Sequence, residues 1–257
     1  MSPRRRAPRP RTDEPAAAAA AAGGVDEGAA NAAGQDEPRA AAAAGRRRKP
    51  GSGRRYAGRS AAERQAEQRQ RFLAAGRVLF ADSGFRATSV RALCREAGVI
   101  DRYFYRNFAD TQALLAALYT AEMDTVEARI LAVFNAAEAG APQQRIEPAM
   151  DTFFAAFEDR RFARICWLEV LGVGPDIDAL YLERQNRFAR LLETVGRQLR
   201  PDWPLDAQET QITTLALVGA ISQSALHWYL TDYAAPRAVL VRTNLRLIRG
   251  ALAALQE

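Results

Sequence analysis

The stretch over residues 84–115 restricts the fold of this chain more than any other part of its sequence. Thr88 and Ser89 are residue types that cap helix N-termini, and residues 90–97 repeat apolar side chains at the spacing of one helix face. Gly98 then favours a sharp turn, because glycine readily adopts the left-handed backbone that ends a helix. The pattern predicts a short helix followed by a tight turn.

A second short helix is predicted from about Asp101 to Asn107, with Phe104 and Phe108 facing inward. Two short helices joined by a tight turn form a helix-turn-helix, whose second helix can enter the major groove of DNA. Long polar and aromatic side chains on its outer face suit base edges and phosphates. These side chains are Asp101, Arg102, Tyr103, Tyr105 and Arg106.

The surrounding sequence resembles the DNA-binding head of the tetracycline-repressor (TetR) family of one-component regulators. The resemblance is close over about residues 65–118, and beyond them the chain fits the family in its length and its all-helical pattern. It implies a homodimer that places two reading helices in successive major grooves, and a body whose effector opposes DNA binding. The motifs that carry it are Gly84-Phe85, Thr88-Ser89-Val90, Ala97-Gly98-Val99, Phe104-Tyr105, Phe108 and Leu114-Leu115.

The resemblance also implies roles for individual residues. In the family, the residues that open the first helix of the motif contact phosphate, and a tyrosine that Tyr105 matches reaches the DNA backbone. Arg102 and Tyr103 stand where many members have glycine and a small residue, and Thr111 stands where many have lysine, so the operator cannot be copied from relatives. The expected DNA-binding residues are Thr88, Ser89, Arg91, Asp101, Arg102, Tyr103, Tyr105, Arg106 and Thr111.

Positive charge is concentrated toward the N-terminal end of the 257-residue chain, whose net charge is +6. Residues 1–60 hold 13 Lys/Arg against 6 Asp/Glu, whereas residues 111–257 hold 14 against 18. This asymmetry fits a polyanion that meets one end of the molecule, and a basic tail on an ordinary solvated surface would give the same numbers. Residues 1–59 are low-complexity Ala, Arg, Pro and Gly sequence that cannot offset chain entropy by burial, so we expect a disordered tail.

The rest of the sequence has no alternating strand pattern and predicts an all-α fold. Ser60 and Glu63 form a capping box that starts a helix over 61–82. Further helices are expected over about 111–138, 144–158, 160–171, 176–200, 206–232 and 236–255. The expected domains are a tail over 1–59, a helix-turn-helix DNA-binding domain over 60–110 and a helical ligand-binding and dimerisation domain over 111–257.

Large aromatic side chains on several inward faces of the body predict an effector cavity, because stiff rings are hard to pack without voids and small-molecule sites are mostly apolar. The alternative is that these rings are simply core. We expect a small apolar or aromatic effector with little charge, since no basic cluster faces inward, and no cofactor. The expected lining residues are Met123, Phe153, Phe157, Trp167, Tyr181 and His227.

The last two predicted helices are apolar on more than one face, which indicates burial on more than one side. They form either a core within the chain or a two-fold four-helix bundle with a second copy, the dimer mode common in the resembling family. The expected dimer contacts are Leu217, Ile221, Trp228, Val241, Leu245, Ile248 and Leu252.

Two other functional classes, an enzyme and an interaction module, compete with a DNA-binding regulator. An enzyme is disfavoured, because His227 is the only histidine and the sequence has no Gly-rich phosphate loop, nucleophile elbow or HExxH motif. Cys94 and Cys166 lack the spacing of a metal site, so no catalytic residue and no metal are expected. An all-helical interaction module would explain the helices but not the outward Arg and Tyr residues. We therefore predict a cytoplasmic, ligand-responsive repressor that binds a palindromic operator as a homodimer and has no contact with membranes.

Overall fold

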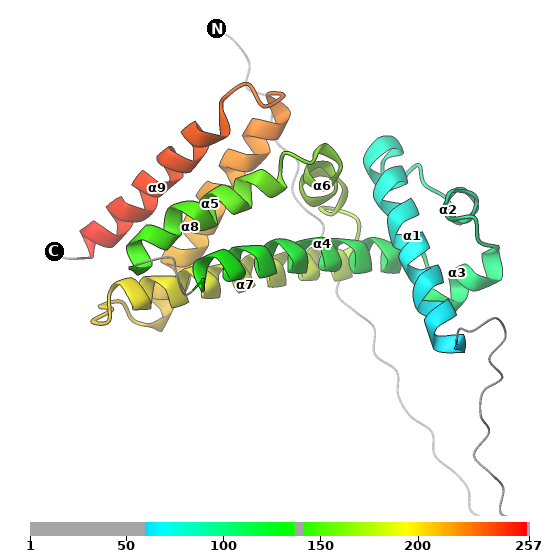
Figure 1. Ribbon diagram of the computed structural model, residues 1–257, viewed down its shortest axis with the longest axis horizontal. Helices are drawn as coiled ribbons and strands as arrows, with labels where there is room; N and C mark the ends of the chain where they lie inside the picture. The colour runs from blue at the N-terminus through cyan, green and yellow to red at the C-terminus, as the bar shows by residue number, and fades with distance from the viewer. Residues whose placement is uncertain (1–59, 137–140, 256–257) are drawn as a thin grey trace, which may run out of the picture. The chain divides into compact units, whose positions relative to one another are not determined.

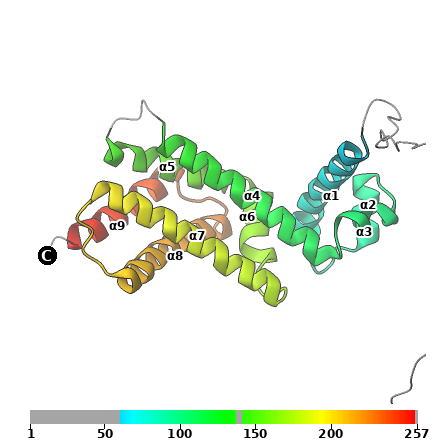
Figure 2. The ribbon, with the colours of Figure 1, turned by 90° about the horizontal axis from the view of Figure 1, so that it is seen from below.

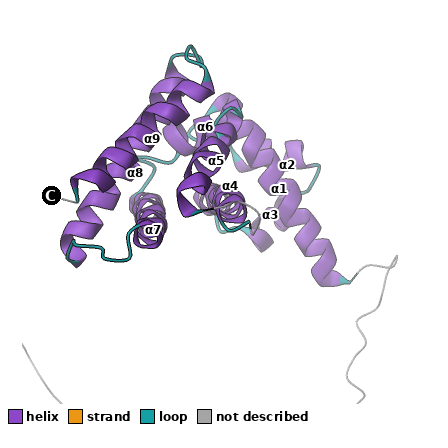
Figure 3. Cartoon of the chain, turned by 60° about the vertical axis from the view of Figure 1, so that its left-hand side comes forward, coloured by secondary structure: helices purple, strands orange, loops and turns teal. Residues whose placement is uncertain are grey.

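The computed structural model describes residues 60–136 and 141–255, and every regular element within these ranges is helical (Figures 1 and 3). The all-α prediction is confirmed. The tail predicted over 1–59 lies outside the described residues. None of the described helices combines the length and the apolar character needed to cross a lipid bilayer.

The first three helices form the head: α1 (Ala61–Ser83), α2 (Val90–Ala97) and α3 (Asp101–Asn107). The capping box at the start of α1 is present, since the Ser60 side chain accepts a hydrogen bond from the backbone N–H of Glu63, whose carboxylate accepts one from the backbone N–H of Ser60. These two bonds satisfy backbone donors that a helix start leaves free. The sequence pattern therefore fixes where the head begins.

The turn between α2 and α3 follows the predicted chemistry. Ser89 is the N-cap of α2 and accepts a hydrogen bond from the Ala92 backbone N–H at 3.2 Å. Gly98 ends α2 in the left-handed conformation, with φ of +63°, and a residue with a Cβ would be strained there. This turn sets the angle at which α3 leaves α2.

Three buried rings hold α3 against α1. Phe72 of α1 meets Phe104 and Phe108 edge-on, with ring centroids 5.3 Å and 6.3 Å apart. Arg69 covers the outer side of this cluster, with its guanidinium carbon 4.5 Å from the centroid of the Phe108 ring. Each fully buried phenylalanine contributes about 1.5–3 kcal/mol of transfer free energy. Tertiary packing therefore holds the short helix α3 in position.

The remaining helices form the body, with α4 running from the head into it (Figures 1 and 2). The closest helix pairs in the body are α4 with α5, α7 with α8, and α5 with α9. Their bounds are α4 Thr111–Phe134, α5 Pro142–Ala156, α6 Arg160–Arg164, η1 Ile165–Glu169, α7 Pro175–Leu199, α8 Ala207–Leu230 and α9 Arg237–Ala254.

Two predicted helices differ from the observed ones. The helix expected over 111–138 ends at Phe134. The helix expected over 160–171 is a single α-helical turn, α6, that continues as the π-helix η1. A π-helix changes the direction of successive side chains relative to an α-helix, and such segments occur often at functional sites. Spacing rules for the α-helix therefore fail across 165–169.

Candidate nucleic-acid interface and effector cavity

The second helix of the motif presents long side chains to solvent. Phe104 is fully buried, whereas its neighbour Tyr105 is 62% exposed. Asp101, Arg102 and Arg106 are exposed as well, so the outer face of α3 carries the side chains that the sequence placed there. Such a face can reach base edges and phosphates in a major groove.

The side chain of Arg102 contacts Tyr103 in the absence of DNA. Its guanidinium donates a hydrogen bond to the Tyr103 hydroxyl at 3.2 Å, and its guanidinium carbon lies 5.0 Å from the centroid of that ring. Arg106 lies over the same ring at 5.9 Å, and Tyr103 is half-buried beneath the two cations. The hydrogen bond from Arg102 lowers the pKa of Tyr103. Tyr103 therefore serves as a platform for two arginines, which a small residue at that position could not.

At the start of α2, the structure differs from the expected phosphate contacts at one residue, Thr88. Thr88 is buried, and its hydroxyl donates to the Gly84 carbonyl oxygen at 2.8 Å, so that proton is used inside the protein. Ser89 and Arg91 are the exposed groups at this end of α2. Thr111, the first residue of α4, is half-buried. The side chains left to meet a phosphate here are therefore those of Ser89 and Arg91.

Comparison with known proteins places the head in a family. Residues 72–118 match the family described as bacterial regulatory proteins, tetR family. The HTH-type transcriptional repressor KstR2 of Mycobacterium tuberculosis strain H37Rv is 29% identical over 185 residues, which are 58% of this chain and 90% of that protein.

The DNA-binding head of this chain, over residues 72–118, is that of the TetR family. TetR-family proteins are transcriptional regulators, so the chain is a DNA-binding regulator of a class that is generally not enzymatic.

Solved structures extend the likeness in fold beyond the head. The fatty acid degradation regulator FadR of Bacillus halodurans matches with a TM-score of 0.62 and 17% identity, covering 70% of this chain and 94% of that chain. FadR of Bacillus subtilis, solved in complex with stearoyl-CoA, matches with a TM-score of 0.59 and 17% identity, over 70% of this chain and 96% of that chain. At this identity the likeness concerns the fold alone.

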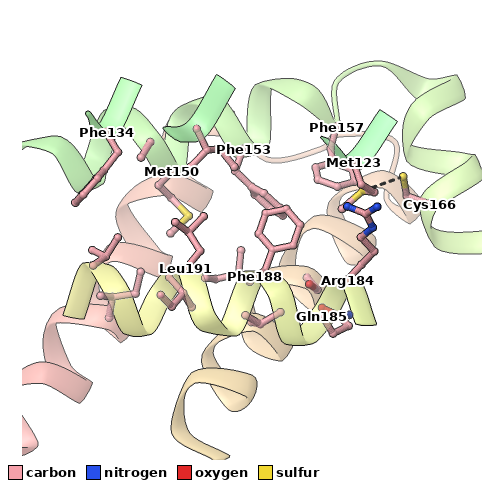
Figure 4. Close-up of a pocket in the computed structure, with 18 of the residues that line it drawn as sticks. Met123, Phe134, Met150, Phe153, Phe157, Cys166, Arg184, Gln185, Phe188 and Leu191 are labelled. Atoms are coloured by element: carbon pink, nitrogen blue, oxygen red, sulfur yellow. Dashed lines mark hydrogen bonds between the residues drawn. The ribbon is translucent and has the colours of Figure 1, made fainter. Parts of the chain in front are cut away.

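The body encloses a mostly apolar cavity of about 100 Å³ between α4, α5, η1, α7 and α8. Figure 4 shows the rings of Phe153 and Phe188 between α5 and α7. Five of the six residues expected to line the cavity do line it. They come from α4, from α5 and its C-terminal end, from η1 and from α7. These are Met123, Phe153, Phe157, Trp167 and Tyr181.

His227, the sixth expected lining residue, does not reach the cavity. It is exposed on α8, while Val218 and Ile221 of the same helix line the cavity. His227 comes nine positions after Val218, which is about two and a half turns and so places the two residues on opposite faces. The apolar neighbours of His227 in the sequence, Trp228 and Tyr229, hid this orientation.

Sequence reasoning missed Arg184, which lines the cavity and is only 6% exposed. Its neighbours Glu183 and Arg187 make this part of α7 resemble a solvated charged run. The signal that could have found it is helical spacing, since Tyr181, Arg184 and Phe188 recur at the three- and four-residue steps of one face. The sequence predicted no inward basic cluster, and the structure places one arginine, Arg184, on the cavity wall.

The two cysteines are inert thiols. Cys94 is buried in the head, and burial followed by the neighbouring Asp101 raises its pKa to about 11. Burial raises the pKa of Cys166 well above its usual value, and its sulfur lies 3.6 Å from the Met123 sulfur on the cavity wall. Both thiols stay protonated near neutral pH, so neither is an activated nucleophile.

The residues expected at a dimer seam lie in the core of the protomer instead. Trp228 is 4% exposed, and its indole N–H donates to the Ala235 carbonyl oxygen at 2.7 Å. On α9 the inward face packs against α5 of the same chain. Ile221, Trp228, Val241, Leu245 and Ile248 are buried, and Leu217 and Leu252 are half-buried. These buried side chains are therefore used for packing within the protomer.

The π-helix η1 connects the cavity to the head. Trp167 lines the cavity, and two residues later the Glu169 carboxylate accepts a hydrogen bond from the Phe85 backbone N–H at 2.7 Å. Arg164 donates to the same carboxylate at 3.0 Å. Phe85 lies in the turn between α1 and α2. The Glu169 to Phe85 hydrogen bond therefore joins the head to the short helix that carries a cavity-lining residue.

Arg102→Ala is expected to flatten base preference in each half-site, because arginine can bond guanine O6 and N7 together, a contact worth about 1–3 kcal/mol of discrimination. Sequence selection from a random DNA pool, followed by affinity measurements on the ranked sites, checks this. Arg91→Ala is the matched control and should weaken all sequences alike, since a phosphate contact carries no base information. The same ranked motif from Arg102→Ala and wild type would show that Arg102 does not read bases.

Proposed function

We propose that this TetR-family regulator is a ligand-responsive repressor that binds a palindromic operator as a homodimer in the cytoplasm. One observation carries the proposal: the exposed reading helix and an apolar cavity belong to one chain and are joined through η1. The relatives named above support it, because KstR2 is a transcriptional repressor and the FadR of Bacillus subtilis was solved with stearoyl-CoA.

The proposed mechanism is a coupling between two binding equilibria. An effector that enters the cavity pushes on Trp167 and η1, and the Glu169 to Phe85 hydrogen bond passes that displacement to the head. DNA selects one placement of the two heads, and the effector selects another. Each ligand then lowers the affinity for the other by the same factor, as reciprocal linkage requires.

The outer face of α8 and α9 is the proposed dimer surface. Ile212 and Leu230 of α8 are each 60% exposed, and with Gly219 they fall within about 20° of one another on a helical wheel. On α9, Leu247 is 48% exposed, and a Cβ at Gly250 would meet nothing within 4 Å. Exposed apolar groups beside glycines that allow close helix approach suit a self-complementary contact with a second copy.

Fluorescence anisotropy with the DNA upstream of the chain's own gene tests the proposal. We expect specific binding of a two-fold symmetric site that persists in excess competitor DNA. Screening by thermal shift identifies compounds that stabilise the protein, because a ligand that binds only the folded state raises its melting temperature. Those compounds should then release the operator. Operator binding that no stabilising compound reverses would contradict the ligand response, and binding that is uniform over all sequences would favour the interaction module.

A further inference from the structure

Two buried N–H donors on the cavity wall have no hydrogen-bond partner in the described protein: Nε1 of Trp167 and Nε of Arg184. Nearly all buried polar groups in folded proteins are hydrogen-bonded, so an unpaired one indicates a missing partner. Among the buried side-chain atoms of the described residues that lack a hydrogen bond, only these two belong to residues of the cavity wall, and both are donors. The cavity therefore offers hydrogen-bond donors, and a molecule bound in it is expected to carry an acceptor.

The surroundings of Arg184 define what kind of acceptor fits. Figure 4 shows its side chain extending from α7 toward Met123, at the end of the cavity where Cys166 lies. One terminal nitrogen of Arg184 pairs with Asp124, and a Glu183 oxygen lies 3.5 Å from Nε without forming a hydrogen bond. Its charge is thus already largely compensated, while one N–H stays available. A neutral carbonyl oxygen can satisfy that N–H as well as a carboxylate can.

Trp167 supplies the second donor from a fixed position. Its ring stacks on Phe157, with centroids 4.9 Å apart and planes 24° from parallel. The indole N–H carries no charge and accepts nothing, so it too requires an oxygen acceptor. Trp167 of η1 and Arg184 of α7 both line the same small cavity, so a ligand held there lies beside residues from two elements.

Apart from the polar groups of Tyr119, Tyr181, Gln185 and Ser222, the rest of the cavity wall is apolar, and part of it is adaptable. Phe153, Phe188 and Leu191 offer rings and a branched chain but no polar atom (Figure 4). An apolar cavity of about 150 Å³ holds a benzene molecule, so the present volume of about 100 Å³ suits a short chain. Met123 and Met150 are flexible, unbranched side chains that can move aside for a longer one.

We infer that the effector carries an acyl oxygen on an apolar chain, with the oxygen bound by Arg184 and Trp167 and the chain lying against the Phe153 and Phe188 rings. This inference rests on the proposed function in one respect: the bound molecule is an effector only if the regulator responds to ligands. A free carboxylate and a thioester carbonyl share this chemistry. Gln185 already donates to the Tyr181 hydroxyl at 2.6 Å, so that pair is internally engaged and is assigned no part.

Calorimetric titration of the full chain in the absence of DNA tests the assignment. The probes are hexanoate, S-methyl thiohexanoate and hexane, which share a six-carbon chain and differ in the acyl oxygen. We expect at least one acyl compound to bind wild type about tenfold more tightly than hexane, as a charge-assisted or well-placed hydrogen bond allows. Preference for hexanoate identifies a carboxylate, and preference for the thioester identifies a carbonyl.

Two variants and a matched control assign the oxygen to its donors. Arg184→Met keeps the apolar stem and removes the donor, and Trp167→Phe keeps the ring and removes its N–H, so each should bring the acyl compound to within about twofold to threefold of hexane. Arg187→Met also removes an arginine 3.3 Å from Asp124, but one that does not line the cavity, so it should keep the preference. Thermal unfolding verifies that each variant is folded.

Hexane binding as tightly as both acyl compounds, no binding of any probe, or an equal loss in Arg187→Met and Arg184→Met would each overturn the assignment. The operator assay is separate and distinguishes the two proposals. A chain that prefers acyl compounds but ignores DNA would refute the proposed function and keep this site. A chain that binds an operator and releases it only with compounds lacking an acyl oxygen would refute this site and keep the proposed function.

Discussion

Leu247→Glu combined with Gly250→Glu is expected to yield a folded monomer that has lost specific operator binding. Leu247 is 48% exposed and Gly250 faces open space, so both glutamates are solvated in a single protomer. Glutamate also has a higher helix propensity than glycine. In a two-fold dimer the new carboxylates would be buried as like charges, at a cost of several kcal/mol. Operator affinity should fall more than about 100-fold, because one head replaces two.

Light scattering measures the oligomeric state of the variant, and fluorescence anisotropy measures its affinity for the operator. Leu182→Glu is the matched control, since Leu182 is 60% exposed but lies on α7, and this variant should stay dimeric and bind normally. Leu245→Glu with Ile248→Glu should instead unfold the protomer, because both side chains are buried in its own core. A Leu247, Gly250 double variant that remains a dimer would place the interface elsewhere.

Phe104→Ala is expected to remove about 3–5 kcal/mol of stability from the head and, with it, DNA binding. Phe104 is fully buried, and its ring lies 5.3 Å from Phe72 and 5.9 Å from Phe108. Because α3 has only seven residues, packing through this ring decides whether the helix exists at all. Urea unfolding followed by circular dichroism measures the loss.

The neighbouring ring supplies the control for that experiment. Tyr105→Ala removes a side chain of similar size from the same helix, but one that is 62% exposed, so its free energy of unfolding should change by about 0.5 kcal/mol or less. Its effect should appear in DNA affinity alone. If Phe104→Ala unfolds at the same urea concentration as Tyr105→Ala, the three-ring cluster is not what holds the reading helix.

Local chemistry made the head predictable. Ser60, Ser89 and Gly98 each act on backbone groups within four residues, so their roles follow from sequence alone. The same holds for the capping box of α8, where Asp206 and Glu209 bond each other's backbone. The reading face of α3 then follows from the helical period, because Phe104 and Phe108 mark the buried side.

The body was less predictable, because its helices carry apolar residues on two faces. On α8, Ile221 and Trp228 turn inward while Ile212 and Leu230 turn outward, and periodicity gives no rule for choosing between the two stripes. The choice depends on helices that cover these two only once the chain has folded, α7 for α8 and α5 for α9. Arg184 was missed for a related reason, since a charged residue enters a cavity wall only when partners such as Asp124 are brought to it from a distant helix.

The hydrogen bond between Phe85 and Glu169 has a consequence for how such regulators diversify. The donor is a backbone N–H, so any residue other than proline at position 85 can supply it. Arg77 and Asp82 of α1 also pair with the body, through Glu122, Asp159 and Arg161. A head that keeps these two side chains can therefore change its reading residues without redesign of the junction. Recognition of new DNA sites and recognition of new small molecules can then change in separate steps, by exchange of whole segments between genes.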